Sequence, residues 1–127
     1  MTSPQRTILL VEDNEVNRDM LVRRLQRAGH EVTTAGDGEA ALAAMRELKP
    51  AVVLMDMNLP IMDGWTACAA AQNDSRLADI PIIALTAHAM EEDKARALAA
   101  GCSDYATKPV DVPDLLSRIS AHLYASH

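Results

Sequence analysis

The sequence predicts an α/β domain in which five helices cover a doubly wound, parallel sheet of five strands. Short apolar runs alternate along the chain with segments of helical periodicity, and such alternation indicates parallel strands joined by right-handed crossovers. The length of 127 residues is that of one domain. No internal repeat, low-complexity tract or linker interrupts the pattern, so we expect a single domain over residues 1–127 with its core in residues 7–123.

The first strand and the first helix occupy the N-terminal part of the chain. Ile8–Val11 is a short, continuous apolar run, which is typical of a strand buried on both faces. From Asn14 the apolar period becomes helical, and Gly29 follows as the expected C-terminal cap. The apolar stripe that we expect to face the sheet consists of Val16, Met20, Leu21, Leu25 and Ala28.

The next two strands enclose an alanine-rich helix. Glu31–Ala35 is brief and more polar than the first strand, which favours a place at the edge of the sheet. Glu39–Leu48 has the composition of a helix, and Pro50 ends it. Ala51–Met55 is a second apolar run of the fully buried type, and Asp56 follows it directly.

The alternation continues in the second half of the chain. A loop rich in turn residues leads into a helix over Trp65–Gln72. Ile80–Leu85 is the fourth predicted strand, and Pro81 lies at its entry, where a missing N–H group is tolerated. Met90–Ala100 is predicted to be a helix that Gly101 ends.

The last predicted unit is a short strand followed by a helix. Asp104–Thr107 is the strand, and Asp111 is the expected N-cap of the helix, because its side chain can accept hydrogen bonds from the first free N–H groups. The apolar stripe of this helix consists of Val112, Leu115, Leu116, Ile119 and Leu123.

The composition excludes several classes of protein. The formal net charge of −6 argues against a general nucleic-acid binder, because such a protein needs a basic face. No apolar run approaches the ~20 residues that span a bilayer, and the N-terminus lacks the apolar segment of a signal peptide. We therefore expect a cytoplasmic protein with no membrane or direct nucleic-acid partner. Its two cysteines, Cys68 and Cys102, are predicted to be reduced packing residues rather than part of a disulfide framework.

Charged and hydroxyl side chains follow the predicted strands at the points where the strands end. Glu12 and Asp13 follow the first strand, Asp56 the third, Thr86 the fourth and Lys108 the fifth. The carboxyl ends of the strands in an open α/β sheet meet at one edge, where ligands bind. Lys108 is also one of only three lysines in the chain. We therefore expect these five side chains to form a single site.

The chemistry of these side chains predicts a phosphorylation site. Three carboxylates close together repel one another unless a cation joins them, and hard oxygen ligands suit Mg²⁺. An ionised aspartate can accept a phosphoryl group, and phosphoryl transfer needs mainly positioning and charge neutralisation. The ammonium group of Lys108 can supply part of this neutralisation, and the hydroxyl of Thr86 can hydrogen-bond a phosphoryl oxygen.

Four segments carry a resemblance to a known family, namely Leu10–Asn14, Met55–Gly64, Leu85–Ala87 and Tyr105–Pro109. Together they resemble the receiver domain of two-component response regulators, in particular single-domain receivers of the chemotaxis-regulator type. The resemblance covers nearly the whole chain. It implies a flavodoxin-like fold with strand order 2-1-3-4-5, and a signalling switch without an output domain.

The resemblance implies a role in phosphorylation for each matching residue. Asp56 would be the phosphoacceptor, Lys108 would pair with the phosphoryl group, and Thr86 would move to bond it. Tyr105 would be the aromatic switch that turns inward when Thr86 moves. The small side chain of Ala87 would leave room for the phosphoryl group to enter.

The resemblance also implies a set of Mg²⁺ ligands. Asp13 would bind the metal directly together with Asp56, and Glu12 would act largely through bound water. The backbone carbonyl of Asn58 would complete the ligands that the protein supplies. The peptide bond before Pro109 would be cis, which costs little at an X-Pro bond.

The partners of such a receiver follow from the same resemblance. A sensor histidine kinase or a histidine phosphotransfer protein would donate the phosphoryl group and dock near the first helix, where Val16 and Met20 lie close to Asp13. A downstream protein target would read the output face formed by Met90–Ala100, the fifth strand and the last helix. The protein would catalyse only its own phosphorylation and dephosphorylation, so it would not be a conventional enzyme.

Three alternative interpretations stay open. Val11–Asn17 and Met57–Gly64 also resemble receivers attached to hybrid sensor kinases, so the chain could be an excised domain. A phosphatase with an aspartate nucleophile would need a second aspartate two residues after it, where this sequence has Asn58. A flavin carrier of the same architecture would need a Ser/Thr/Gly-rich loop after the first strand, where this sequence has Glu12–Asn14.

Overall fold

In the computed structural model, strands alternate with helices along the chain, and the strands form one open sheet. The structure describes residues 7–57, 59, 62–86, 95, 96, 98–108 and 110–125. The five strands pair in parallel in the order β2-β1-β3-β4-β5, as predicted. In chain order, the strands are β1 Thr7–Val11, β2 Glu31–Ala35, β3 Val52–Asp56, β4 Ile82–Thr86 and β5 Asp104–Thr107. The labelled helices are α1 Glu15–Arg27, α2 Gly38–Leu48, α3 Gly64–Gln72 and α5 Val112–Ala125.

The helix predicted over Met90–Ala100 falls largely outside the described residues. The part that is described is helical, at residues 95–96 and 98–99. None of the helices within the described part of the chain is long and apolar enough to cross a membrane.

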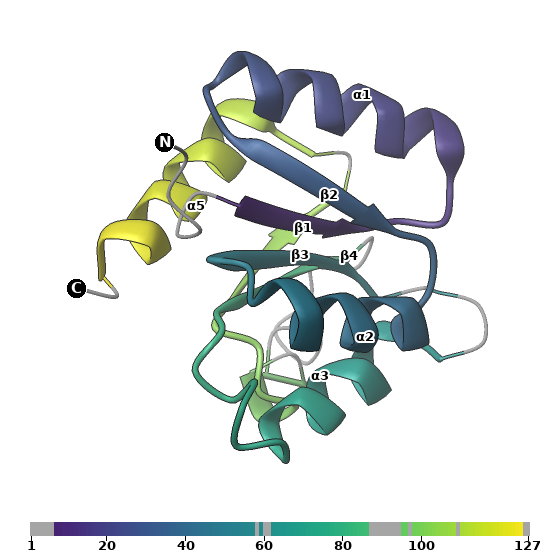
Figure 1. The fold of residues 1–127 in the computed structure, drawn as a ribbon. Helices are drawn as coiled ribbons and strands as arrows, with labels where there is room; N and C mark the ends of the chain where they lie inside the picture. The colour runs from purple at the N-terminus through teal and green to yellow at the C-terminus, as the bar shows by residue number, and fades with distance from the viewer. Residues whose placement is uncertain are drawn as a thin grey trace.

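The two faces of the sheet carry separate apolar layers, because successive strand side chains point to opposite faces. Figure 1 shows α1 and α5 on one face and α2 and α3 on the other. The α1/α5 layer is built mainly from branched aliphatic side chains, including Ile8, Leu10, Leu54, Ile83, Leu85, Leu115 and Ile119. The α2/α3 layer is richer in small and sulfur-containing side chains, including Ala41, Met45, Met55, Ala67, Cys68, Ala71 and Cys102.

Side-chain caps account for the small differences between predicted and observed helix starts. The carboxylate of Asp37 accepts a hydrogen bond from the N–H of Ala40 at 2.8 Å, so α2 begins at Gly38. Asp63 does the same for α3 through the N–H of Thr66 at 2.7 Å. Asp111 caps α5 as predicted, with Oδ1 3.1 Å from the N–H of Asp114. A helix begins at the residue after its cap, so α2 and α3 both begin one residue before the predicted Glu39 and Trp65.

The buried stripe of α1 is narrower than predicted. Only Leu21 and Leu25 are buried, while Val16 is 77% exposed, Met20 is 39% exposed and Ala28 is exposed. Leu21 and Leu25 are separated by about 40° around the helix, but Val16 is about 140° away from Leu21. The prediction of Val16, Met20 and Ala28 as sheet-facing residues is therefore wrong, because the sheet covers only a small arc of α1 and the cap residue Ala28 lies past its end.

The ends of two strands differ by one residue from the prediction in a way that matters for the site. β3 includes Asp56 and β4 includes Thr86, because the ladder pairs Asp56 with Leu85 and Thr86 with Thr107. The backbones of both polar residues are therefore fixed by sheet pairing rather than by a loop.

Candidate functional site

Three carboxylates meet at the carboxyl edge of the sheet. Glu12 and Asp13 follow β1 and Asp56 ends β3, and ligand oxygens of the three residues all lie within 4.8 Å of one another. Glu12 is 1% exposed and Asp56 is 2% exposed, whereas Asp13 is exposed. The strand-end prediction for these three residues is confirmed in position, because neighbouring parallel strands β1 and β3 end at the same level.

Lys108 closes this cluster from β5. Its Nζ donates to Oδ2 of Asp56 at 2.9 Å and to Oε2 of Glu12 at 3.3 Å. The backbone N–H of Lys108 donates to the carbonyl of Thr86 at 2.7 Å, which ties the end of β4 to the lysine. Thr86 itself is buried. The arrangement therefore brings two buried carboxylates, one cation and a nearby hydroxyl-bearing residue to one edge.

The electrostatics of the cluster show that it is crowded with negative charge. Burial raises the pKa of Glu12 to about 7, helped by its hydrogen bond with Asp56 and the charge of Asp56, although Lys108 and Asn17 act in the opposite direction. Burial lowers the pKa of Lys108, but its contacts with Asp56 and Glu12 outweigh this and the net shift is upward. The two buried carboxylates therefore carry more negative charge than Lys108 alone neutralises.

The donor set fits a hard divalent cation. Carboxylate oxygens are the ligands that Mg²⁺ prefers, and the metal is usually bound by one or two carboxylates while it keeps several waters. The cluster offers three carboxylates, which is enough for such a site, and the exposed Asp13 leaves one side open to water. The raised pKa of Glu12 also indicates that the cluster has too little positive charge beside its carboxylates.

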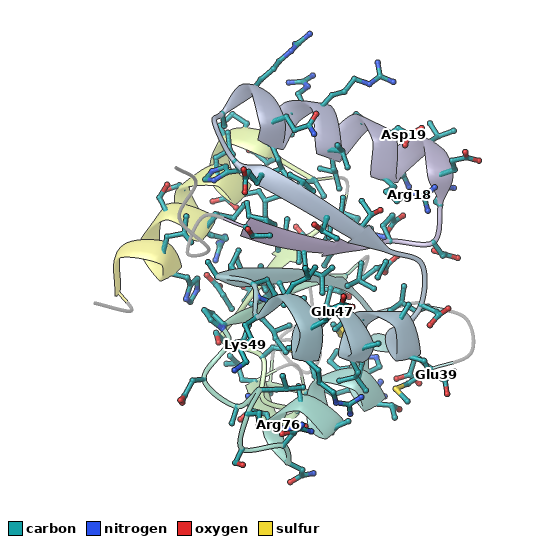
Figure 2. All side chains as sticks on the ribbon, viewed as in Figure 1. Arg18, Asp19, Glu39, Glu47, Lys49 and Arg76 are labelled. Atoms are coloured by element: carbon teal, nitrogen blue, oxygen red, sulfur yellow. The ribbon has the colours of Figure 1, made fainter. Side chains whose placement is uncertain are left out.

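Two contacts to Glu12 were not predicted from the sequence. The amide Nδ2 of Asn17 donates to Oε1 of Glu12 at 3.4 Å, and an Nη of Arg18 donates to the carbonyl of Glu12 at 3.5 Å. The side chain of Arg18 lies on the side of α1 that faces the end of β1 (Figure 2). The available signal was the position of Asn17 in the first turn of a helix that starts directly after the acidic pair.

A pocket opens beside the cluster on the α1 side. The residues that line it are Glu12, Asn17, Met20, Leu21, Lys108 and Val110. A shallow groove continues along α1 from the shared residue Met20, and it is lined by Val16, Met20, Arg23, Arg24 and Arg27. The acidic cluster is thus reached from an exposed face that combines apolar and cationic side chains.

Several predicted site residues lie elsewhere or outside the described residues. Asn58, Ala87 and Pro109 belong to the part of the chain that the structure does not describe, so their predicted roles stay predictions. Tyr105 lies on β5, half-buried, and packs against the α2/α3 layer. The guanidinium of Arg118 lies 5.7 Å from the centre of its ring, and an Nη of Arg118 donates to Asp104 at 2.7 Å.

Two glycines hold the loop that follows Asp56. The N–H of Gly64 donates to the carbonyl of Met57 at 3.2 Å, and a Cβ on Gly64 would lie 2.5 Å from the carbonyl oxygen of Asp56. The N–H of Gly38 donates to the carbonyl of Met62 at 3.0 Å, and a Cβ on Gly38 would lie 2.3 Å from the carbonyl oxygen of Met62. Both close approaches require a residue without a side chain, so α2 and α3 fix the loop at its far end.

Comparison with known sequences gives a consistent family. Residues 8–120 match the family described as "Response regulator receiver domain". The chain is 35% identical over 118 residues to the polar-differentiation response regulator DivK of Brucella anthropi, which covers 93% of this chain and 96% of DivK. It is 38% identical over 116 residues to the DNA-binding dual master transcriptional regulator RpaA of Synechocystis, covering 91% of this chain. The match covers 48% of RpaA, so the chain spans about half the length of that relative.

Comparison with solved structures gives the same fold. A response regulator from Chloroflexus aurantiacus superposes with a TM-score of 0.89 at 33% identity, over 94% of this chain and 98% of the other. The receiver domain of the sensor histidine kinase PA1611 from Pseudomonas aeruginosa, with a magnesium ion coordinated in the active site cleft, gives 0.86 at 35% identity over 93% and 97%. The receiver domain of Ssk1 from Saccharomyces cerevisiae, crystallised with the histidine phosphotransfer protein Ypd1, gives 0.84 at 30% identity over 94% and 90%.

Proposed function

The chain belongs to the family of response regulator receiver domains, and we propose that it is a signalling switch. Phosphorylation of Asp56 would activate this switch. As a receiver domain, it is a phosphorylatable module of two-component signalling rather than a conventional enzyme. The observation that carries the proposal is the position of Asp56, whose carboxylate lies within 4.8 Å of two other carboxylates and 2.9 Å from Lys108.

The proposed reaction is the transfer of a phosphoryl group from a phosphohistidine of a partner. A carboxylate oxygen of Asp56 attacks phosphorus, the P–N bond to the imidazole breaks, and the imidazole leaves with the bonding electron pair. Lys108 remains beside the new acyl phosphate and neutralises part of its charge. The hydroxyl of Thr86 bonds a phosphoryl oxygen, and the small side chain of Ala87 leaves space for it. Later hydrolysis of the acyl phosphate returns the free carboxylate of Asp56.

The metal that this chemistry requires is proposed to be Mg²⁺. Asp13 and Asp56 would bind it directly, Glu12 largely through water, and the backbone carbonyl of Asn58 would complete the set. When bound, Mg²⁺ neutralises charge on the carboxylates and on the phosphoryl oxygens. The crowding of Glu12, Asp13 and Asp56 supports this assignment, as does the magnesium ion in the related receiver of PA1611.

The proposed phosphodonor is a sensor histidine kinase or a histidine phosphotransfer protein that docks on α1. Val16 and Met20 are exposed there, and the groove that they line leads to the pocket beside Glu12 and Lys108. Exposed apolar side chains next to a charged site suit a partner interface. The complex of Ypd1 with the receiver of Ssk1 supports this type of partner.

The proposed output passes through the opposite flank of the site to a downstream protein target. β5 carries Tyr105 and leads to Lys108, and α5 holds β5 through the ion pair of Arg118 with Asp104 at 2.7 Å. Phosphorylation would shift the population of Tyr105 toward an inward position and so change the face formed by Met90–Ala100, β5 and α5. The cytoplasmic location expected from the sequence stays a prediction.

The test is phosphorylation by acetyl phosphate, which needs no partner protein. The chain is incubated with acetyl phosphate in Mg²⁺ or in EDTA, and the phosphoprotein is measured by intact mass and by its lability to hydroxylamine. We expect one phosphoryl group in Mg²⁺ and none in EDTA. Asp56→Asn should abolish the signal, and Asp74→Asn, which changes an ion-paired aspartate outside the site, should retain it. Labelling that persists in EDTA or in Asp56→Asn would contradict the proposal.

A further inference from the structure

The two cysteines of the chain lie in contact inside the α2/α3 layer. The Sγ atoms of Cys68 and Cys102 are 2.9 Å apart, and both thiols are free. Cys68 lies in the middle of α3 and is 0% exposed, and Cys102 lies two residues before β5 and is 4% exposed. Neither thiol has a part in the proposed phosphorylation. Within the sequence they are separated by 34 residues, so only the fold brings them together.

The contact is closer than apolar packing requires. Non-bonded carbon atoms pack at about 3.5–4.0 Å, and sulfur is larger than carbon. A disulfide needs a separation of ~2.05 Å, so the two sulfurs would have to approach by about 0.9 Å from their 2.9 Å contact.

The backbone on both sides of the pair is already held together. One turn after Cys68, Nε2 of Gln72 donates to the carbonyl of Gly101 at 3.1 Å. The N–H of Ser103, next to Cys102, donates to the carbonyl of Ile82 at 2.8 Å. Cross-linking would therefore join two segments whose relative position is fixed in the reduced protein.

The contact also distinguishes the two thiols. The hydrogen bond between them, together with burial, raises the pKa of Cys68. Accepting that hydrogen bond lowers the pKa of Cys102, although burial acts against it. Cys102 is also the more exposed of the two, so a peroxide meets its sulfur first.

We propose that Cys68 and Cys102 form a redox modification site, which a peroxide converts into an intramolecular disulfide and a dithiol reductant restores. The thiolate of Cys102 attacks one oxygen of hydrogen peroxide, the O–O bond breaks and hydroxide leaves, which gives a sulfenic acid. The sulfur of Cys68 then attacks this sulfenic sulfur, the S–O bond breaks, and water leaves with the thiol proton of Cys68. The two sulfurs lose two electrons in total, and the peroxide is reduced to water.

The disulfide would tie α3 to the entry of β5 without touching the acidic cluster. Cys102 precedes the amino end of β5, whereas Lys108 follows its carboxyl end. The cross-link closes a loop of more than thirty residues of the unfolded chain, so the oxidised form should be more resistant to unfolding. Burial should make the oxidation slower than that of a free thiol in solution.

The experiment exposes the full chain to graded hydrogen peroxide in EDTA, followed by denaturation, alkylation with N-ethylmaleimide and intact mass measurement. We expect the loss of two hydrogen atoms and no alkylation, with reversal by dithiothreitol. Because the chain has only two cysteines, an intramolecular disulfide can only join Cys68 to Cys102. The oxidised protein should unfold at a Tm higher by about 5 °C or more.

Single and double variants keep the proposal testable if one of them folds poorly. Cys68→Ala and Cys102→Ala should each lose the intramolecular product and the rise in Tm, and the double variant should be insensitive to peroxide. Thiols that stay reduced in the folded chain at peroxide concentrations that oxidise them in urea would overturn the proposal. Oxidation that yields only linked dimers or sulfinic acid would also overturn it.

Phosphorylation by acetyl phosphate provides an independent readout. The oxidised and reduced proteins should be phosphorylated at rates within about twofold of each other, because the cross-link lies away from the acidic cluster. A loss of more than tenfold on oxidation would overturn the separation of the two sites. Absence of phosphorylation in both forms would count against the proposed function and leave the disulfide result unchanged.

Discussion

Two of the clusters that pair carboxylates with cationic side chains lie at opposite edges of the sheet. At the carboxyl edge, Asp56 and Glu12 share Lys108 at 2.9 and 3.3 Å. In the connection from α3 to β4, at the amino edge, Asp74 pairs with Arg76 at 3.0 Å and with Arg46 at 3.6 Å. Figure 2 shows Arg76 on the far side of the molecule from Arg18, which contacts Glu12.

The same kind of contact has opposite electrostatic results at the two edges. Burial and the neighbouring Asp56 raise the pKa of Glu12 to about 7. The hydrogen bonds and charge of Arg76 lower the pKa of Asp74 to about 2, where the side chain keeps contact with water. At the carboxyl edge, Lys108 alone cannot neutralise the crowded, buried carboxylates, so negative charge remains. At the amino edge, Arg46 and Arg76 together neutralise the single carboxylate of Asp74. The first cluster can therefore take up a further cation, and the second is a surface contact of the fold.

The largest difference between the clusters should be seen when each loses its cation. Lys108→Ala is expected to slow phosphorylation by acetyl phosphate in Mg²⁺ by about 10²-fold, because a positive charge next to the reacting group is removed. Arg76→Ala should leave the rate within about twofold of the wild type. Initial rates of phosphoprotein formation measure both. Equal rates in the two variants would remove the functional distinction between the clusters.

A smaller, opposite pair of effects is expected on the stability of the metal-free protein. Asp56→Asn should raise the free energy of unfolding in EDTA by about 1 kcal/mol, since one of the crowded charges is lost while Lys108 keeps Glu12. Asp74→Asn should lower it slightly, because its ion pairs are lost. Urea unfolding at about pH 7.5, where carboxyl groups of ordinary pKa are ionised, measures both. A destabilised Asp56→Asn would show that the cluster is not strained by its charge.

The smallest effect is expected from pH. The pKa of Glu12 is raised in the folded state, so its contribution to stability is complete below about pH 4.5 and is lost as the pH rises through about 7. The pKa of Asp74 is lowered, so its contribution is present above about pH 4 and is lost as the pH falls toward 2. In EDTA, the difference in unfolding free energy between wild type and Glu12→Gln should fall by at most about 1 kcal/mol between pH 6.5 and 8. A difference that rises over this range would refute the assignment.

Much of the acidic site could be predicted because it depends on few variables. Once β1, β3, β4 and β5 are located to within a residue, parallel pairing alone brings Glu12, Asp56 and Lys108 to one edge. The fold followed from the same alternation of patterns. The off-by-one ends at Asp56 and Thr86 did not matter, because either assignment leaves these residues at the carboxyl edge.

The features that could not be predicted depend on how elements are placed relative to one another. Periodicity identified one face of α1 but could not show how wide an arc the sheet covers, so Val16 and Met20 were wrongly assigned to the core. The amide of Asn17 reaches Glu12 only because of the rotation of α1 about its axis. The contact of Cys68 with Cys102 needs the position of α3 against the entry of β5, and each cysteine on its own looks like ordinary packing.

The loop between β3 and α3 has a consequence for mutational tolerance. Gly64, the first residue of α3, lies against the carbonyl of Asp56, and Gly38, the first residue of α2, lies against the carbonyl of Met62. Any Cβ at either position would collide with the backbone. A saturation library should therefore accept no side chain at these two glycines, even though neither glycine carries chemistry.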